Sequence, residues 1–198
     1  MSISQQIQKI DRLKKQIAQC RRCDLHLTRT HTVPGEGDVE ASIMLIGEAP
    51  GKNEDEQGKP FVGRAGGILD QLLSSVNLTR NDIYLCNILK CRPPNNRNPL
   101  ASEIASCAGS LDIQIKIVDP RVIGTLGTFA TAYIFEKFHL PPATISTVAG
   151  KKIEINTAFG PKIIVPLFHP AVATYNPTKI DVLKRDFKIL KKLAGSQN

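Results

Sequence analysis

The stretch Ser42-Ile-Met-Leu-Ile-Gly-Glu-Ala-Pro-Gly51 joins an apolar run to a turn rich in glycine and proline. Its apolar run over residues 42–46 is broken by Gly47 and Pro50, which predicts a short buried strand that ends in a sharp turn. Similar patterns predict further strands at residues 83–89, 121–124, 144–156 and 162–167. The chain therefore contains several apolar segments of the length of a strand.

Segments with helical spacing of apolar residues alternate with these strands. Helices are predicted at residues 3–19, from 68 onward, and at 102–117, 128–138 and 179–193, with loops at 32–42, 53–60 and 92–99. Strands that alternate with helices imply an α/β fold with a mostly parallel sheet, and such sheets bind ligands at the carboxyl ends of their strands. Because no repeat or linker divides the chain, we expect one domain over residues 1–198.

The composition is that of an ordinary globular protein, with 41% hydrophobic and 22% charged residues. No apolar run approaches the roughly 20 residues of a membrane span, and the first residues lack the apolar core of a signal peptide. We therefore expect a cytoplasmic protein without a membrane partner, and a monomer. A net charge of +8 and a pI near 9.4 favour a polyanionic partner. Only 5% of residues are aromatic and Trp is absent, which argues against a broad stacking platform for single strands.

The five cysteines suggest a metal site rather than disulfides, because a reducing compartment disfavours disulfides and an odd number leaves one unpaired. Cys20 and Cys23 have the spacing of a chelating pair, and Cys91 and Cys107 complete four soft ligands. Four thiolates suit zinc or an iron–sulfur cluster, and the spacing does not separate the two. The alternative is that Cys91 and Cys107 are simply buried. Cys86 lies within a predicted strand and is interpreted as a core residue.

Polar and aromatic residues near the predicted strand ends suggest a pocket for a base. The turn after residue 47 exposes the backbone N–H groups of Glu48 and Ala49, which can hold a developing anion. Phe61 is a lone aromatic in a polar loop, either a stacking surface or a loop anchor. Asn87 and His169 end two apolar strands, and each is either a ligand-binding residue or a structural one.

Three motifs resemble the family 4 uracil-DNA glycosylases. They are Gly47-Glu-Ala-Pro-Gly-x-x-Glu-Asp-x-x-Gly-x-Pro-Phe-Val-Gly-Arg-Ala-Gly66, Asn87-x-x-Lys-Cys-Arg-Pro-Pro-x-Asn-Arg-x-Pro99 and Phe168-His-Pro-Ala171. The resemblance runs over about residues 20–177 and includes the cysteine spacing. It implies a three-layer α/β/α sandwich, excision of uracil from single- or double-stranded DNA, and a 4Fe-4S cluster as cofactor. The implied cluster ligands are Cys20, Cys23, Cys91 and Cys107.

The resemblance also implies roles for the pocket residues. Asn87 reads the uracil edge, Phe61 stacks on the flipped base, and His169 stabilises the departing uracil together with the N–H groups of Glu48 and Ala49. Ala49 stands where family 1 relatives have Asp, so either Glu48 or Asn96 positions the attacking water. Glu54 is placed beside C5 of uracil. The implied DNA-phosphate contacts are Arg64, Arg92 and Arg97.

Two features of the motifs differ from close relatives. The loop after His169 lacks the leucine often used to fill the space that a flipped base leaves, and Tyr175 or Val172 are its candidate substitutes. The loop after Asn87 carries no inserted basic segment of the kind that traps DNA covalently, which favours ordinary turnover. The leading hypothesis is therefore a monofunctional glycosylase. The alternatives are a nonenzymatic iron–sulfur or zinc nucleic-acid-binding module and an electron-transfer protein, neither of which needs Asn87, Phe61 and His169 together.

Overall fold

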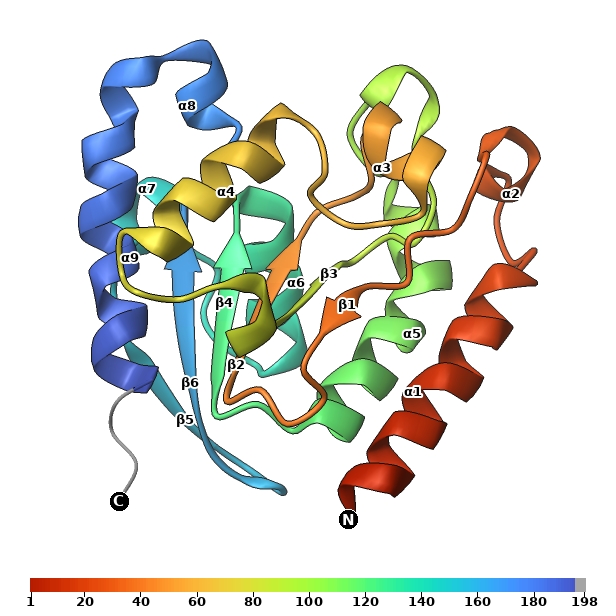
Figure 1. Ribbon diagram of the computed structural model, residues 1–198, viewed down its shortest axis with the longest axis horizontal. Coiled ribbons are helices and arrows are strands. Elements are labelled where there is room, and N and C mark those ends of the chain that lie inside the picture. The colour runs from red at the N-terminus through yellow and green to blue at the C-terminus, as the bar shows by residue number, and fades with distance from the viewer. Residues whose placement is uncertain (195–198) are drawn as a thin grey trace.

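The computed structural model describes residues 1–194 and is built on a 6-stranded sheet of order β1-β3-β2-β4-β6-β5 (Figure 1). The central strands run parallel to one another, and the two edge strands pair antiparallel with their neighbours. The strands are β1 (Glu36–Gly37), β2 (Ile43–Gly47), β3 (Ile83–Asn87), β4 (Val122–Leu126), β5 (Ile153–Thr157) and β6 (Gly160–Leu167). The predicted α/β class with a mostly parallel sheet is confirmed.

Three central strands are buried at every position. Every residue of β2, β3 and β4 is buried, because helices cover both faces of the sheet. Alternate side chains point to opposite faces, so Met44 and Ile46 join one core cluster while Ile43 and Leu45 join the other. Strand β5 instead alternates between half-buried and exposed residues, as expected for an edge strand.

The helices form the two outer layers of the sandwich. The first core cluster packs beneath α1 (Ile3–Ala18), α5 (Ala101–Val118) and α6 (Thr128–Lys137). The second packs beneath α4 (Arg64–Ser74), which crosses in front of the sheet in Figure 1, and beneath α9 (Ile180–Ala194), which stands at the left of the same view beside β6. The short helices are α2 (Leu25–Thr28), α3 (Lys52–Gln57), η1 (Arg80–Asp82), η2 (Pro94–Asn96), α7 (Ile145–Val148), α8 (Val172–Tyr175) and η3 (Pro177–Lys179). Within residues 1–194 no helix is long and apolar enough to cross a membrane.

Several local predictions were wrong. The predicted loop at 32–42 contains β1, which pairs with β3, and the predicted loop at 92–99 contains η2. The predicted loop at 53–60 contains α3, because the Glu54 side chain caps the helix by accepting a hydrogen bond from the Gly51 N–H (3.1 Å). Helix α4 begins at Arg64 rather than at 68. The predicted strand at 144–156 is helical at its start, and only Ile153–Thr157 joins the sheet. Gly150 separates the two parts, with φ of 73° and an N–H that bonds to the Pro166 carbonyl (2.8 Å).

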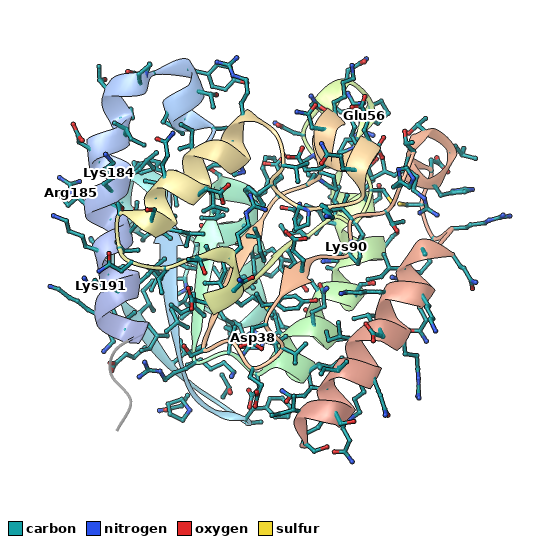
Figure 2. The ribbon with its side chains drawn as sticks, in the orientation of Figure 1. Asp38, Glu56, Lys90, Lys184, Arg185 and Lys191 are labelled. Atoms are coloured by element: carbon teal, nitrogen blue, oxygen red, sulfur yellow. The ribbon has the colours of Figure 1, made fainter. Side chains whose placement is uncertain are left out.

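We expect Phe187→Ala to destabilise the fold by about 3–5 kcal/mol, measured by chemical denaturation. The Phe187 ring is fully buried on the inner face of α9, so its removal leaves a cavity in the second core cluster. The matched control is Lys191→Ala on the outer face of the same helix, where Lys191 projects away from the protein (Figure 2). The control is expected to change stability by less than about 0.5 kcal/mol. Equal losses in both variants would contradict the inward packing of Phe187.

Candidate active site

The strand ends of the sheet open onto one cavity of about 600 Å³. Glu48 and Ala49 follow β2, Asn87 ends β3, and His169 follows β6. All four line this cavity together with Phe61, which the chain contributes from the loop before α4. The structure therefore brings together five residues predicted from separate segments. Parallel strands explain this, since their carboxyl ends meet at the same edge of the sheet.

Gly47 makes the close packing at this edge possible. It lies opposite Asn87 in the register of β2 and β3. A Cβ atom at Gly47 would lie 2.3 Å from Oδ1 of Asn87 and 2.7 Å from Cζ of Phe61, which no real side chain tolerates. Only glycine lets the amide and the ring approach the strand end together. Asn87 itself is 2% exposed and so presents its amide to the cavity rather than to bulk solvent.

Phe61 adopts a strained backbone conformation. Its φ is 53°, in the left-handed region, which costs a non-glycine residue on the order of 1–3 kcal/mol. Its ring stacks against the imidazole of His169, with centroids 5.8 Å apart and planes inclined by 24°. A Cβ atom at Gly66 would lie 1.7 Å from the Phe61 carbonyl oxygen, so the start of α4 packs directly on this loop. The loop is thus held in a conformation that presents the ring to the cavity.

His169 is a neutral hydrogen-bond donor at neutral pH. Burial lowers the pKa of His169 from its ordinary 6.5 to about 4, although the nearby Glu54 carboxylate opposes this effect. The Ala171 N–H donates to Nδ1 of His169 at 3.1 Å. Since Nδ1 accepts, the single proton of the neutral ring lies on Nε2. This tautomer can donate to a ligand atom without carrying a positive charge.

Glu48 and Glu54 are both acidic residues of the cavity wall, but their surroundings differ. Burial raises the pKa of Glu48 above its ordinary 4.5. Glu54 instead uses its carboxylate to accept hydrogen bonds from the N–H groups of Gly63 (2.7 Å) and Gly51 (3.1 Å). It therefore joins the loop after β2 to the loop before α4. The sequence offered Glu54 only as a neighbour of the base, and its bridging role emerges from the fold.

The four predicted metal-binding cysteines line a second cavity. Cys20 and Cys23 follow α1, Cys91 lies beyond β3, and Cys107 lies within α5. Three of their sulfur atoms accept N–H hydrogen bonds, from Arg22 to Cys20 (3.4 Å), from Arg29 to Cys91 (3.1 Å) and from the Lys90 backbone to Cys107 (3.2 Å). Within residues 1–194, no group of three or more His, Cys, Asp or Glu residues is arranged to hold a metal ion. Cys86 is fully buried in the first core cluster, as predicted.

Lys90 lines the second cavity and was not singled out from the sequence. It is 2% exposed, and Figure 2 shows it inside the molecule near the loop after β3. Its ammonium group donates to the backbone carbonyl of Asn87 and to Oε1 of Gln114, both at 2.6 Å. Burial lowers the pKa of Lys90, while Cys86 and Cys107 oppose the shift. No local pattern distinguishes this lysine from exposed ones, since its side-chain partner comes from α5.

The three predicted phosphate-binding arginines lie in different settings. Arg64 opens α4 and lines the first cavity, as does Arg97. The guanidinium of Arg97 is bound by both carboxylate oxygens of Glu103, at 2.6 and 2.9 Å. Arg92 does not line the cavity within the described residues, and its Nε donates to Oδ1 of Asn96 at 2.7 Å. Arg97 and Arg92 therefore brace the loop after Cys91, and their contacts with DNA stay predictions.

Comparisons with known proteins agree on one family. The family model described as Uracil DNA glycosylase superfamily matches residues 34–193. A Type-4 uracil-DNA glycosylase of Archaeoglobus fulgidus is 43% identical over 192 residues, which are 96% of this chain and 96% of that protein. One from Saccharolobus solfataricus is 44% identical over 190 residues, covering 95% of this chain and 88% of that protein. One from Thermotoga maritima is 41% identical over 164 residues, covering 83% and 82%.

The matched residues include the β2 turn, the end of β3 and the His169 loop, which together build the first cavity. The family resemblance noted in the motifs is therefore confirmed over nearly the whole chain. This chain belongs to the uracil-DNA glycosylase superfamily and, within it, to the type-4 uracil-DNA glycosylases.

Proposed function

We propose that this protein hydrolyses the N-glycosidic bond of deoxyuridine in DNA, releasing free uracil and leaving an abasic site. The observation that carries the proposal is the convergence of Asn87, Phe61 and His169 on one cavity at the strand ends. This set combines an amide that can read a base edge, a ring that can stack on a base, and a neutral donor. The identity to type-4 relatives over most of the chain supports the same conclusion.

Recognition of uracil follows from the chemistry of Asn87 and Phe61. The amide offers one donor and one acceptor, which pair with an acceptor and a donor on the uracil edge. Cytosine presents the opposite pattern, so it would leave the buried amide mismatched, and sites of this kind discriminate by about 10⁴–10⁵. The ring of Phe61 supplies a stacking surface, worth about 1–3 kcal/mol. A base must leave the duplex to reach both groups.

Uncharged hydrogen-bond donors are proposed to stabilise the leaving uracil. As the glycosidic bond breaks, negative charge develops on the uracil oxygens and positive charge on the sugar. The Nε2–H of His169 can donate to such an oxygen without carrying a positive charge. The backbone N–H groups of Glu48 and Ala49 are proposed as further donors. The loss of one such donor typically lowers the rate by about 10²–10³.

A carboxylate is proposed to position the attacking water. Ala49 leaves the place of the family 1 aspartate without an acidic group, and Glu48 is the neighbouring carboxylate in the cavity. Glu54 is less suited, since its oxygens already accept two backbone N–H groups. Asn96 also lines the cavity and is the alternative. A carboxylate beside the sugar would in addition stabilise its positive charge.

DNA is proposed to lie across the mouth of this cavity. The net charge of +8 attracts a polyanion, and Arg64, Arg92 and Arg97 are the proposed phosphate contacts. Tyr175 lines the cavity and is 88% exposed, so it is better placed than Val172 to fill the space that the flipped base leaves. The basic residues of α9 lie elsewhere: Lys184, Arg185 and Lys191 project from its outer face (Figure 2). A monomeric state and a cytoplasmic location stay predictions.

The four cysteines of the second cavity are proposed to bind a 4Fe-4S cluster. Four thiolates are the donor set of such a cluster, in which each sulfur binds a different iron. The N–H groups that point at three of the sulfurs suit thiolates, because they stabilise negative charge on sulfur. The resemblance to the type-4 family favours the cluster over zinc, which the same donor set would also accept. The cluster would supply a structural link between α1, the loop after β3 and α5.

The assay that tests the function uses a uracil-containing oligonucleotide, incubated with protein kept anaerobic and metal-replete. We expect free uracil and an abasic site, and Asn87→Ala should lower kcat/KM by about 10³ or more because the base edge is no longer read. The matched control is Asn156→Ala, which removes an exposed amide of β5 and should leave activity unchanged. No release of uracil by the unmodified protein would reject the enzyme and favour a nonenzymatic nucleic-acid-binding module.

The pH dependence of kcat/KM should report Glu48. Burial raises its pKa above 4.5, and the active form is the carboxylate, so activity should fall with decreasing pH around a midpoint above 4.5. Glu48→Gln should lower the rate and abolish this acidic limb. His169 titrates at a pKa of about 4 and should affect only the lowest part of the profile. An unchanged acidic limb in Glu48→Gln would show that another group positions the water.

Metal binding should depend on Cys91 and not on Cys86. Cys91→Ala is expected to lose iron, sulfide and visible absorption, and to destabilise the loop that leads to Asn96. Cys86→Ala should retain all three signals, because its side chain lies in the core and not in the second cavity. Equal metal loss in both variants would refute the assigned quartet. Stoichiometric zinc in the unmodified protein would refute the cluster.

A further inference from the structure

Arg80 makes an unusual set of contacts just outside the first cavity. It lies in η1, immediately before β3, and its guanidinium binds both carboxylate oxygens of Asp70, at 2.7 and 3.3 Å. The same group donates to the backbone carbonyl of Pro60 at 3.0 Å and to that of Phe61. Glu36 of β1 adds a further contact at 3.3 Å. The Arg80 side chain therefore donates hydrogen bonds to two consecutive backbone carbonyls of the loop that carries Phe61, the proposed stacking residue.

The loop that carries Phe61 needs contacts from outside to hold its shape, because Phe61 has a backbone conformation that non-glycine residues disfavour. Phe61 has φ of 53°, and α4 packs so closely that Gly66 leaves no room for a Cβ atom beside the Phe61 carbonyl. The close packing of α4 restricts the direction of the Phe61 carbonyl, and in that direction the carbonyl accepts a hydrogen bond from Arg80. The carbonyls of Pro60 and Phe61 belong to the two peptide groups that flank the Cα atom of Phe61. By binding both, Arg80 fixes both peptide planes and with them the direction in which the ring leaves the backbone.

We propose that Arg80 is a positioning residue for uracil excision, which acts by holding the Phe61 carbonyl and thereby the ring that stacks on the flipped base. The inference rests on the function proposed above. Within the described residues Arg80 does not line the cavity, so it acts through Phe61 and not on the substrate. Arginine suits the task because its planar group carries five donors in a fixed fork. A lysine has the charge but cannot span a carboxylate and two carbonyls in the same way.

The competing explanation is that Arg80 only ties η1 to α4 and β1 through its acidic partners. The chain offers a matched control for this. Asp70→Asn weakens the ion pair but leaves the two carbonyl contacts in place. Asp70 is half exposed and lies outside the cavity lining, so its replacement does not touch the proposed catalytic groups.

The test is a double-mutant cycle on kcat and KM for a uracil-containing oligonucleotide, with the thermal midpoint Tm measured for every variant. We expect Arg80→Met to lower kcat/KM by about 10- to 100-fold, in line with the loss of a stacking contact. In the Phe61→Ala background the same change should have less than about a 2-fold effect, because the ring it positions is absent. Asp70→Asn should reduce Tm while keeping kcat/KM within about 2-fold of the unmodified protein.

A second readout separates positioning from folding. Arg80→Lys keeps a positive charge beside Asp70 and Glu36, so this variant should fold even if Arg80→Met does not. Its loss of kcat/KM should likewise be large when the Phe61 ring is present and less than about 2-fold in the Phe61→Ala background. Inhibition by free uracil should weaken in the Arg80 variants together with the loss of kcat/KM, because binding of the free base reports stacking without the chemical step. Equal fold-losses with and without the Phe61 ring would overturn the role of Arg80 while leaving the glycosylase intact. An unmodified protein that releases no uracil would overturn both.

Discussion

A buried ammonium group joins the two halves of the proposed site. Lys90 lines the second cavity and is 2% exposed, so an unpaired charge would be costly there. It is stable there because the Asn87 carbonyl and the Gln114 side chain both accept from it at 2.6 Å. Gln114 in turn donates to the Pro34 carbonyl and the Tyr84 hydroxyl, at 2.6 and 3.1 Å. The end of β3, which is proposed to read the base, is thereby fixed to the helix that carries Cys107.

Most of the acidic residues in and near the motifs accept hydrogen bonds from backbone N–H groups, and Glu48 is an exception. Glu54 bridges two loops, and the buried Asp55 accepts from the backbone N–H groups of Thr30 and His31. Glu103 caps α5 and pairs with Arg97, whose guanidinium lowers the pKa of that carboxyl. Glu48 stands apart, because burial is the cause of its raised pKa. A carboxylate that is not already committed to backbone groups is the one best able to hold water.

The preorganised character of the cavity fits a reaction in which charge develops on a leaving base. Gly47 and Gly66 allow backbone and rings to approach more closely than any side chain would permit. His169 is kept neutral by burial and has its donor proton placed on Nε2 by the Ala171 N–H. Groups fixed in this way need little rearrangement when charge appears, which is the main source of electrostatic catalysis. The strain at Phe61 is the cost of the same arrangement.

The buried strands β2, β3 and β4 were predictable from the sequence alone, because continuous apolar runs and glycine turns are local signals. The edge strand β1 and the start of β5 were not, because short edge strands carry no such run. The same signals placed Glu48, Asn87 and His169 at strand ends, and the family resemblance implied four cysteines apart from Cys86. Each of these sets lines one cavity. The hydrogen-bond partners of the long polar side chains became known only from the three-dimensional structure. Arg80 reaches Pro60 across 20 positions and Lys90 reaches Gln114 across 24. Such partners depend on how helices pack on the sheet, which no local pattern encodes.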